Sequence, residues 1–124
     1  MFRVVLLYPK SDDSHFDTDY YLSNHIPRIR EIFKDLGLVK IEVDVGIASA
    51  TPGQPPPYAS ISYFTFQNLE GFQSGMASQG GWIMGDIINY TNVQPQIQIN
   101  QVVVADTDAR PADQPKPVYF GLGI

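Results

Sequence analysis

His25 and its neighbours are the residues of this sequence best suited to chemistry. The chain has only two histidines, His15 and His25, and imidazole has an ordinary pKa of about 6.5, so it exchanges protons near neutral pH. Pro27 follows His25 closely, and Tyr20 and Tyr21 precede it by about one helical turn. These residue types predict a small-molecule site made of a few polar groups in an apolar wall. His25 is its candidate general acid or base.

The segment from residue 16 to 37 predicts the helix that positions His25. Asp17 can cap the first turn, and Gly37 follows the last apolar residue. His25 falls in the register of an apolar stripe that should face the core, formed by Leu22, Ile29, Ile32 and Leu36.

Pro27 should distort this helix beside His25. Proline has no amide to donate to the carbonyl of Ser23, and in a helix interior it costs about 3 kcal/mol. We therefore expect a bend there, with a carbonyl freed for another donor. An alternative interpretation also stands, in which His25 is an ordinary core residue bonded to a backbone carbonyl.

The remaining elements follow from hydrophobic periodicity. Alternating or continuous apolar runs predict four strands, and Asn68 can cap a second helix that should end at Gly80 and Gly81. The expected strands are residues 2–8, 38–47, 58–66 and 96–104. The resulting order, β-α-β-β-α-β, predicts an α+β, ferredoxin-like monomer: a four-stranded antiparallel sheet with two helices on one face.

One sheet face is left uncovered in this arrangement. The alternating apolar residues of 38–47 and 96–104 would make that face too apolar to remain wet, so we expect a homodimer formed face to face through the two sheets. We assign residues 1–104 to one domain and 105–124 to a proline-rich C-terminal tail. Its apolar end, residues 118–124, should dock on its own domain or on the partner subunit.

Composition excludes several classes of function. The chain has no cysteine, which removes thiolate nucleophiles and cysteine-ligated metal sites. A formal net charge of −5 argues against a nucleic-acid partner. No long apolar run or signal-peptide pattern is present, so we expect no membrane association and a cytoplasmic protein.

Two sequence blocks together carry a resemblance to a known family. The first, FDTDYYLSNHIPRIRE, starts at Phe16, and the second, GDIINYTNVQPQIQINQV, starts at Gly85. Both resemble the EthD family, named for ethyl tert-butyl ether degradation, and the likeness runs from Phe2 to about Val104. The chain departs from the common family pattern at Arg28, where an apolar residue is frequent, and at Ile88, where proline is frequent.

The resemblance implies a dimeric α+β barrel built from ferredoxin-like monomers. Relatives in that superfamily include cofactor-free monooxygenases, lactone isomerases, polyketide cyclases and haem enzymes, so the fold alone selects no reaction. The haem relatives place their ligand elsewhere than His25, and we expect no cofactor. For a metal, His15, Asp17 and His25 are the only evident ligand set, and because Asp17 is better explained as a helix cap, we expect none.

Two hypotheses of different classes remain open. One is a cofactor-independent catabolic enzyme, an oxidoreductase, isomerase or cyclase, that acts on a small, mostly apolar oxygenated or aromatic compound through His25. The other is a non-catalytic binding or accessory protein serving a partner oxygenase, such as a cytochrome P450 system. In both, the ligand would be oriented and enclosed by Tyr8, Tyr21, Phe64, Phe66, Phe72, Met76, Trp82 and Ile83.

Overall fold

The computed structural model describes residues 1–106, so the expectation for residues 118–124 lies outside the described part. Its elements follow the predicted order, with α1, η1 and α2 forming the first helical segment and α3 with η2 the second. They are β1 (Phe2–Pro9), α1 (Thr18–Tyr20), η1 (Tyr21–His25), α2 (Ile26–Phe33), β2 (Leu38–Val45), β3 (Tyr58–Phe66), α3 (Leu69–Gly85), η2 (Asp86–Asn89) and β4 (Gln96–Gln101).

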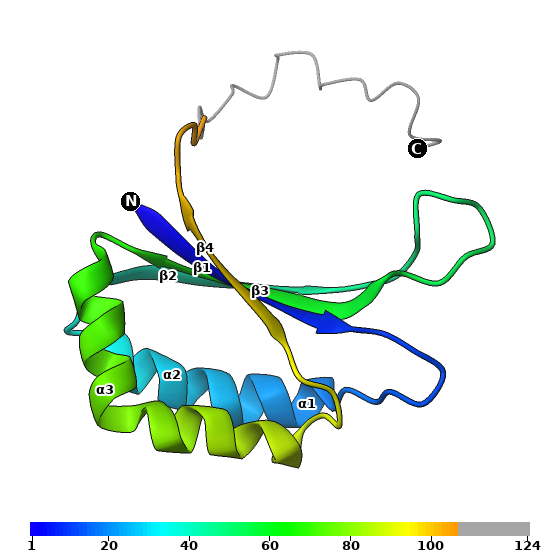
Figure 1. The fold of residues 1–124 in the computed structure, drawn as a ribbon, viewed down its shortest axis with the longest axis horizontal. Helices are drawn as coiled ribbons and strands as arrows, with labels where there is room; N and C mark the ends of the chain where they lie inside the picture. Colours follow the sequence, from blue (N-terminus) through cyan, green and yellow to red (C-terminus); the bar gives the residue numbers. More distant parts are fainter. Residues whose placement is uncertain (107–124) are drawn as a thin grey trace.

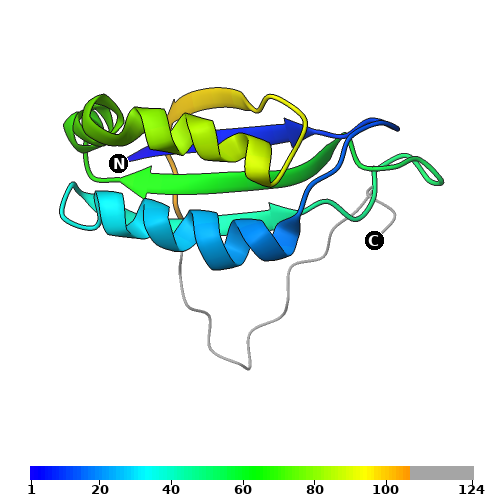
Figure 2. The same cartoon turned by 90° about the horizontal axis from the view of Figure 1, so that it is seen from below.

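The sheet is four-stranded, with the order β2-β3-β1-β4 and antiparallel pairing throughout. The helices lie side by side on one of its faces (Figures 1 and 2). Val4 pairs with Phe64 on one side and with Ile99 on the other, and Val4 and Phe64 are buried against the helices. This arrangement confirms the ferredoxin-like fold.

The first helical segment contains one wide turn that sequence periodicity did not predict. Asp17 caps the segment by accepting from the amide of Tyr20, as expected. Across η1, the amide of Ile26 donates to the carbonyl of Tyr21, five residues back instead of four. The extra residue rotates the register, so Tyr21 is fully buried while Leu22 is 47% exposed. The prediction that Leu22 faces the core is therefore wrong.

Pro27 explains the position of that wide turn. It lies in the first turn of α2, immediately after η1, where a helix tolerates a residue without an amide. The distortion expected beside His25 thus takes the form of a π-helical turn, with His25 at its last position.

The second helix passes very close to the first. A Cβ atom added at Gly75 would overlap the ring of Phe33, and one added at Gly71 would overlap the carbonyl of Leu36. These glycines therefore allow α3 to approach α2 and the turn that follows it. The helix also continues through Gly80 and Gly81, where the sequence predicted its end. Packing at Gly71 and Gly75 against the first helical segment and its turn offsets part of the low helix propensity of glycine in α3.

Two strands are shorter than predicted. β2 ends at Val45 and β4 at Gln101. Ile47 and Val103, both assigned to strands from their alternation, are 91% and 85% exposed. Alternation continues beyond the point where a neighbouring strand is present to pair, so it overestimates strand length.

The open sheet face differs from the predicted one. The register places Ile41, Val43 and Ile97 on the helix-covered face, so the residue sets expected to form the dimer interface are wrong. The open face carries an apolar centre from the two central strands, formed by Val5, Leu7, Ile61 and Tyr63. Polar residues of the edge strands flank it: Lys40, Glu42, Asp44, Gln96, Gln98 and Asn100.

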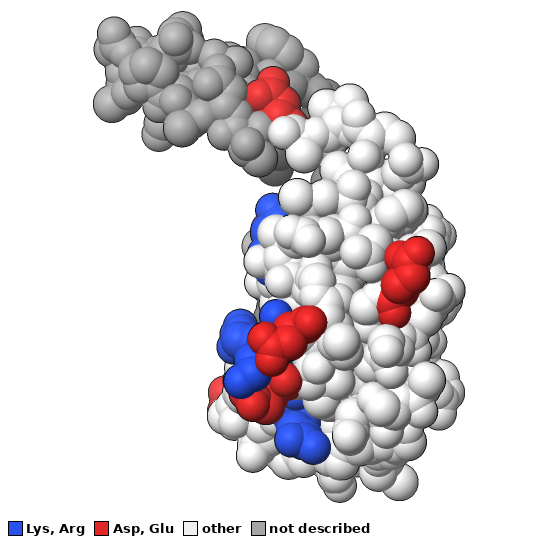
Figure 3. All heavy atoms as spheres, turned by 90° about the vertical axis from the view of Figure 1, so that its left-hand side faces the viewer, with Lys and Arg blue, Asp and Glu red and all other residues white. Residues whose placement is uncertain are grey.

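Charges are mixed on the surface. Lys34 pairs with Glu31 at 3.0 Å, and Lys40 pairs with Glu42 at 3.4 Å. On the face drawn in Figure 3, acidic and basic side chains interleave in one area, and most of the rest is uncharged. Within residues 1–106, no helix combines the length and apolar character needed to cross a bilayer.

We propose that the open face pairs with the same face of a second copy. Leu7, Ile61 and Tyr63 are only partly buried there, and two buried polar atoms of this face, Arg3 Nε and Thr65 Oγ1, have no hydrogen-bond partner among the described residues. Buried polar atoms normally have one, and a docking subunit would provide it. Light scattering at micromolar concentration should therefore give the mass of a dimer.

Leu7→Glu tests this interface, because it places a charge in the apolar centre of the open face. We expect this variant to be a folded monomer. Ile88→Glu is the matched control, since Ile88 is 81% exposed on η2, away from the sheet, and should remain dimeric. A monomeric wild-type protein, or a folded Leu7→Glu dimer, would contradict the proposal.

Candidate functional site

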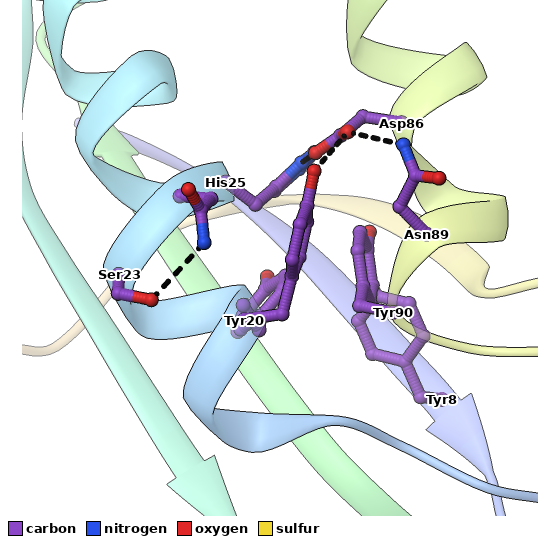
Figure 4. Close-up of polar contacts among 10 residues, drawn as sticks. Tyr8, Tyr20, Ser23, His25, Asp86, Asn89 and Tyr90 are labelled. Atoms are coloured by element: carbon purple, nitrogen blue, oxygen red, sulfur yellow. Dashed lines mark hydrogen bonds and ion pairs between the residues drawn. The ribbon is translucent and has the colours of Figure 1, made fainter.

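His25 is paired with a carboxylate from the other helical segment. Its Nδ1 atom lies 2.8 Å from Oδ2 of Asp86, the first residue of η2. His25 is 2% exposed and Asp86 6% exposed, so this contact is shielded from water. Figure 4 shows the imidazole and the carboxylate meeting between the two helical segments.

Asp86 is held by further donors. Its Oδ1 atom accepts a hydrogen bond of 2.8 Å from the hydroxyl of Tyr20 and one of 2.9 Å from Nδ2 of Asn89 (Figure 4). Burial acts to raise the pKa of Asp86, but the hydrogen bonds from Asn89, His25 and Tyr20 outweigh it, and the net pKa is lowered. Asp86 is therefore an ionised carboxylate at neutral pH.

An ionised carboxylate fixes the tautomer of His25. A carboxylate only accepts hydrogen bonds, so Nδ1 carries the proton and donates it to Asp86. Burial lowers the pKa of His25, although the hydrogen bond and charge of Asp86 partly oppose this. At neutral pH the imidazole is thus uncharged, and its Nε2 atom has a lone pair available to a ligand.

Aromatic rings surround the imidazole. Tyr21 and Trp82 each stack on it, with ring centroids 5.3 Å away and planes 16° apart. Tyr90 lies with its centroid 4.8 Å from that of His25. These contacts, together with the hydrogen bond to Asp86, fix the orientation of the ring.

The buried tyrosines bond to one another and to the sheet. The hydroxyl groups of Tyr8 and Tyr90 lie 2.8 Å apart, and that of Tyr21 lies 2.6 Å from Oγ of Ser62. Burial raises the pKa of all three tyrosines, so they remain protonated. Tyr8 and Tyr21 were predicted to orient a ligand, but their hydroxyls bond to Tyr90 and Ser62, and neither residue lines the cavity described next.

A narrow apolar cavity of about 50 Å³ extends from His25 between the helices and the sheet. Five predicted residues line it, namely Phe64, Phe66, Phe72, Met76 and Ile83, together with Val4, Leu6, Ile29, Phe33, Met84 and Ile97. Met84 and Ile97 are half-exposed and mark where it approaches the surface. Trp82 was predicted in this wall, but its ring stacks on His25 instead. Whether the lining residues bind a substrate stays a prediction.

Sequence reasoning missed the roles of three residues that form the polar cluster with His25, namely Tyr20, Asp86 and Asn89. Asp86 and Asn89 lie three positions apart, and Asn89 precedes Tyr90, which contacts His25. The DIINY block therefore brings a carboxylate, an amide and a ring to the same place. Tyr20 was seen as a neighbour of His25 but not as a donor to Asp86. The sequence signal that could have indicated this cluster is the presence of the DIINY block together with the block that contains His25.

Metal coordination finds no geometric support in the part of the chain that the structure describes. No three side chains of the types His, Asp or Glu converge there. Asp17, one of the three residues considered as ligands, is engaged as the helix cap. The second histidine, His15, has an exposed side chain, and its backbone bonds to Asn92 and Thr91.

Comparisons of the sequence and of the fold with known proteins lead to the same family. The chain has the ferredoxin-like architecture with a histidine–carboxylate pair beside an apolar cavity, and the EthD domain matches residues 11–94. The chain belongs to the EthD family. No curated protein sequence matches it.

Solved structures agree with this assignment. An EthD-like protein from Ralstonia eutropha JMP134 is 32% identical, with a TM-score of 0.81, over 86% of this chain and 96% of that one. An EthD family protein from Bacillus halodurans C-125 is 19% identical, with a TM-score of 0.63, over 82% and 98%. A protein from Shewanella loihica PV-4, proposed to be a monooxygenase, is 10% identical, with a TM-score of 0.54, over 84% and 95%, which shows likeness of fold alone.

The lowered pKa of His25 predicts how stability depends on pH. The folded protein holds His25 neutral, whereas the unfolded chain takes up a proton near pH 6.5. The contribution of His25 is therefore fully present above pH 6.5 and decreases as the pH falls below it. Urea unfolding of wild type and His25→Asn between pH 7.5 and 5.5 should show a greater loss for wild type. Parallel curves would contradict the neutral, buried histidine.

The support of Asp86 by Tyr20 can be tested separately. Tyr20→Phe removes one hydrogen bond to a charged acceptor and should lower the free energy of unfolding more than the control substitution does. Tyr58→Phe is the matched control, because the hydroxyl of Tyr58 makes a 3.2 Å bond to Gln96 at the surface. Its effect should stay within about 0.5 kcal/mol in urea unfolding. Equal effects of the two substitutions would contradict the special position of Tyr20.

Proposed function

We propose that this protein is a cofactor-independent enzyme that acts on a small, mostly apolar oxygenated or aromatic compound, with His25 as the general base and then the acid. The observation that carries this proposal is the His25–Asp86 pair at the wall of an apolar cavity. The proposed class of reaction begins with proton removal, as in an oxygenation, isomerisation or cyclisation of an activated carbon or phenol.

The proposed proton transfer uses both ring nitrogens. Nε2 of neutral His25 takes a proton from an O–H or acidic C–H group of the ligand, and Nδ1 keeps its proton and its bond to Asp86. The resulting imidazolium is stabilised by the adjacent carboxylate charge. A positioned acid or base of this kind contributes about a hundred- to ten-thousandfold to a rate.

The cavity supports a ligand of this class. Its walls are hydrocarbon, aromatic ring and methionine, and His25 is the one polar side chain among the described lining residues. Burying a charged ligand there would cost much more than burying a neutral one. The volume of about 50 Å³ admits only a few heavy atoms, so we infer that the flexible side chains of Met76 and Met84 move when a ligand enters.

A second candidate function is a binding or accessory protein that holds such a compound for a partner oxygenase. One observation favours it: the described cavity walls offer no second hydrogen-bond donor to stabilise a developing anion. Many enzymes stabilise such a charge with several donors. A protein of this kind would bind the ligand through His25 without turning it over.

His25→Asn tests the proposal, because asparagine can keep a donor near Nδ1 but has no atom at the position of Nε2. The stability found in thermal melts should change by about 1 kcal/mol. Turnover of small phenols, aryl ketones or dialkyl ethers should fall about a hundredfold or more, and their binding should weaken. His15→Asn is the matched control and should leave both unchanged. Unchanged binding, with stability lost by several kcal/mol, would identify His25 as a structural residue.

The two candidate functions differ in their response to pH. An enzyme should lose turnover as His25 becomes protonated, whereas a binding protein shows no His25-dependent turnover at any pH. Product analysis across the pH range, on wild type and His25→Asn, separates them. Binding without turnover in wild type would reject the enzyme and retain the accessory protein.

A further inference from the structure

Trp82 lies between the buried histidine and the surface. It precedes Asp86 by four residues, so the two side chains leave the α3–η2 segment on the same side, toward His25. The indole stacks on the imidazole with 5.3 Å between centroids and 16° between planes. Trp82 is 36% exposed, whereas His25 is only 2% exposed. The indole is therefore an outer neighbour of the imidazole.

Arg28 holds Trp82 from the first helical segment. Its guanidinium carbon lies 5.7 Å from the centroid of the indole ring, which is within the range of a cation–π interaction. Arg28 follows His25 by three residues, so both side chains leave the helix on neighbouring positions. Trp82 is thus held by two residues of the first segment, His25 and Arg28.

We propose that Trp82 is a positioning residue, which Arg28 holds over the side of His25 that is nearest the surface, so that the imidazole stays dry, uncharged and able to accept a proton. This inference rests on the proposed function only in assigning a catalytic purpose to the neutral imidazole. The geometric claim concerns the protonation of His25, and it can be tested without any substrate.

The groups that face His25 explain why Trp82 would matter. Asp86 on η2 favours the protonated form, whereas Tyr21 on its own helix and Tyr90 after η2 stay uncharged because burial raises their pKa values. The sheet presents apolar side chains at the cavity. Burial is the main cause that lowers the pKa of His25, and the partly exposed Trp82 is the neighbour whose removal would admit water.

The test is the titration of His25 observed by NMR through its ring protons, in wild type, Trp82→Phe and Trp82→Leu. We expect the midpoint to rise in that order, because phenylalanine keeps a ring on the imidazole and leucine does not. Arg28→Lys, which keeps the positive charge but loses the planar guanidinium over the indole, should raise it as well. Ile88→Ala, a substitution at an 81% exposed residue, is the control that should not move it. The signals of His15 provide the internal reference.

Tryptophan fluorescence gives an independent reading, because Trp82 is the only tryptophan of the chain. Protonated imidazole quenches a stacked indole, so emission should fall on acidification with the midpoint found for His25 by NMR. His25→Asn should abolish this step. A wild-type emission without the step would overturn the stacked arrangement.

The proposal is wrong if folded Trp82→Leu shows the wild-type midpoint. Circular dichroism establishes whether that variant is folded, and if it is not, Trp82→Phe and the charge-conserving Arg28→Lys decide by the same criterion. The proposed function fails in a different way: a shifted His25 titration combined with no turnover in wild type would remove the enzyme and leave the role of Trp82 in place.

Discussion

The close packing of α3 against α2 is the contact on which the site depends. His25 comes from the first helical segment, and Asp86 and Trp82 come from the second. A hydrogen bond of 2.8 Å between side chains as short as those of His25 and Asp86 requires the two backbones to be close. Gly71 and Gly75 permit this approach, because a Cβ atom at either position would overlap atoms of the first segment or of the turn after it. The helix–helix contact therefore sets the geometry of the polar cluster, and the sheet provides the apolar floor beneath it.

The polar cluster is stable inside an apolar core because its donors and acceptors match. A buried carboxylate without partners is strongly unfavourable, but Asp86 accepts from a ring nitrogen, a phenol and an amide. Each removed partner would leave part of that charge unsatisfied. Among the described residues, the Nε2 atom of His25 makes no hydrogen bond, and His25 is the polar residue that lines the cavity. The hydrogen bond between Nδ1 of His25 and Asp86 thus stabilises the buried carboxylate and also leaves the lone pair of Nε2 free to accept a proton.

The sequence predicts the fold better than the site for a physical reason. Periodicity over many residues predicted the element order, the helix cap at Asp17 and the central position of β3, because these depend on local pattern. The π-helical turn is a single-residue shift and leaves no trace in an average period, so Leu22, predicted to face the core, is exposed, and Tyr21 is buried instead. Asp86 is 61 positions from His25, and no local rule pairs residues so far apart. Periodicity also could not distinguish a tyrosine that lines a cavity from one bonded to Ser62.

The surroundings of His25 favour proton acceptance over proton donation in the resting protein. Asp86 alone would favour an imidazolium, and such a histidine could only begin a reaction as an acid. Burial opposes the carboxylate and prevails, so the pKa of His25 is lowered. A neutral imidazole with Nδ1 bonded to an anion is a stronger base at Nε2 than burial alone would leave it, because the anion stabilises the charge that forms on proton uptake. The aromatic neighbours exclude water from the imidazole, and the carboxylate lies where it can stabilise a positive charge on the ring. In the proposed function, the proton would come from a ligand in the cavity.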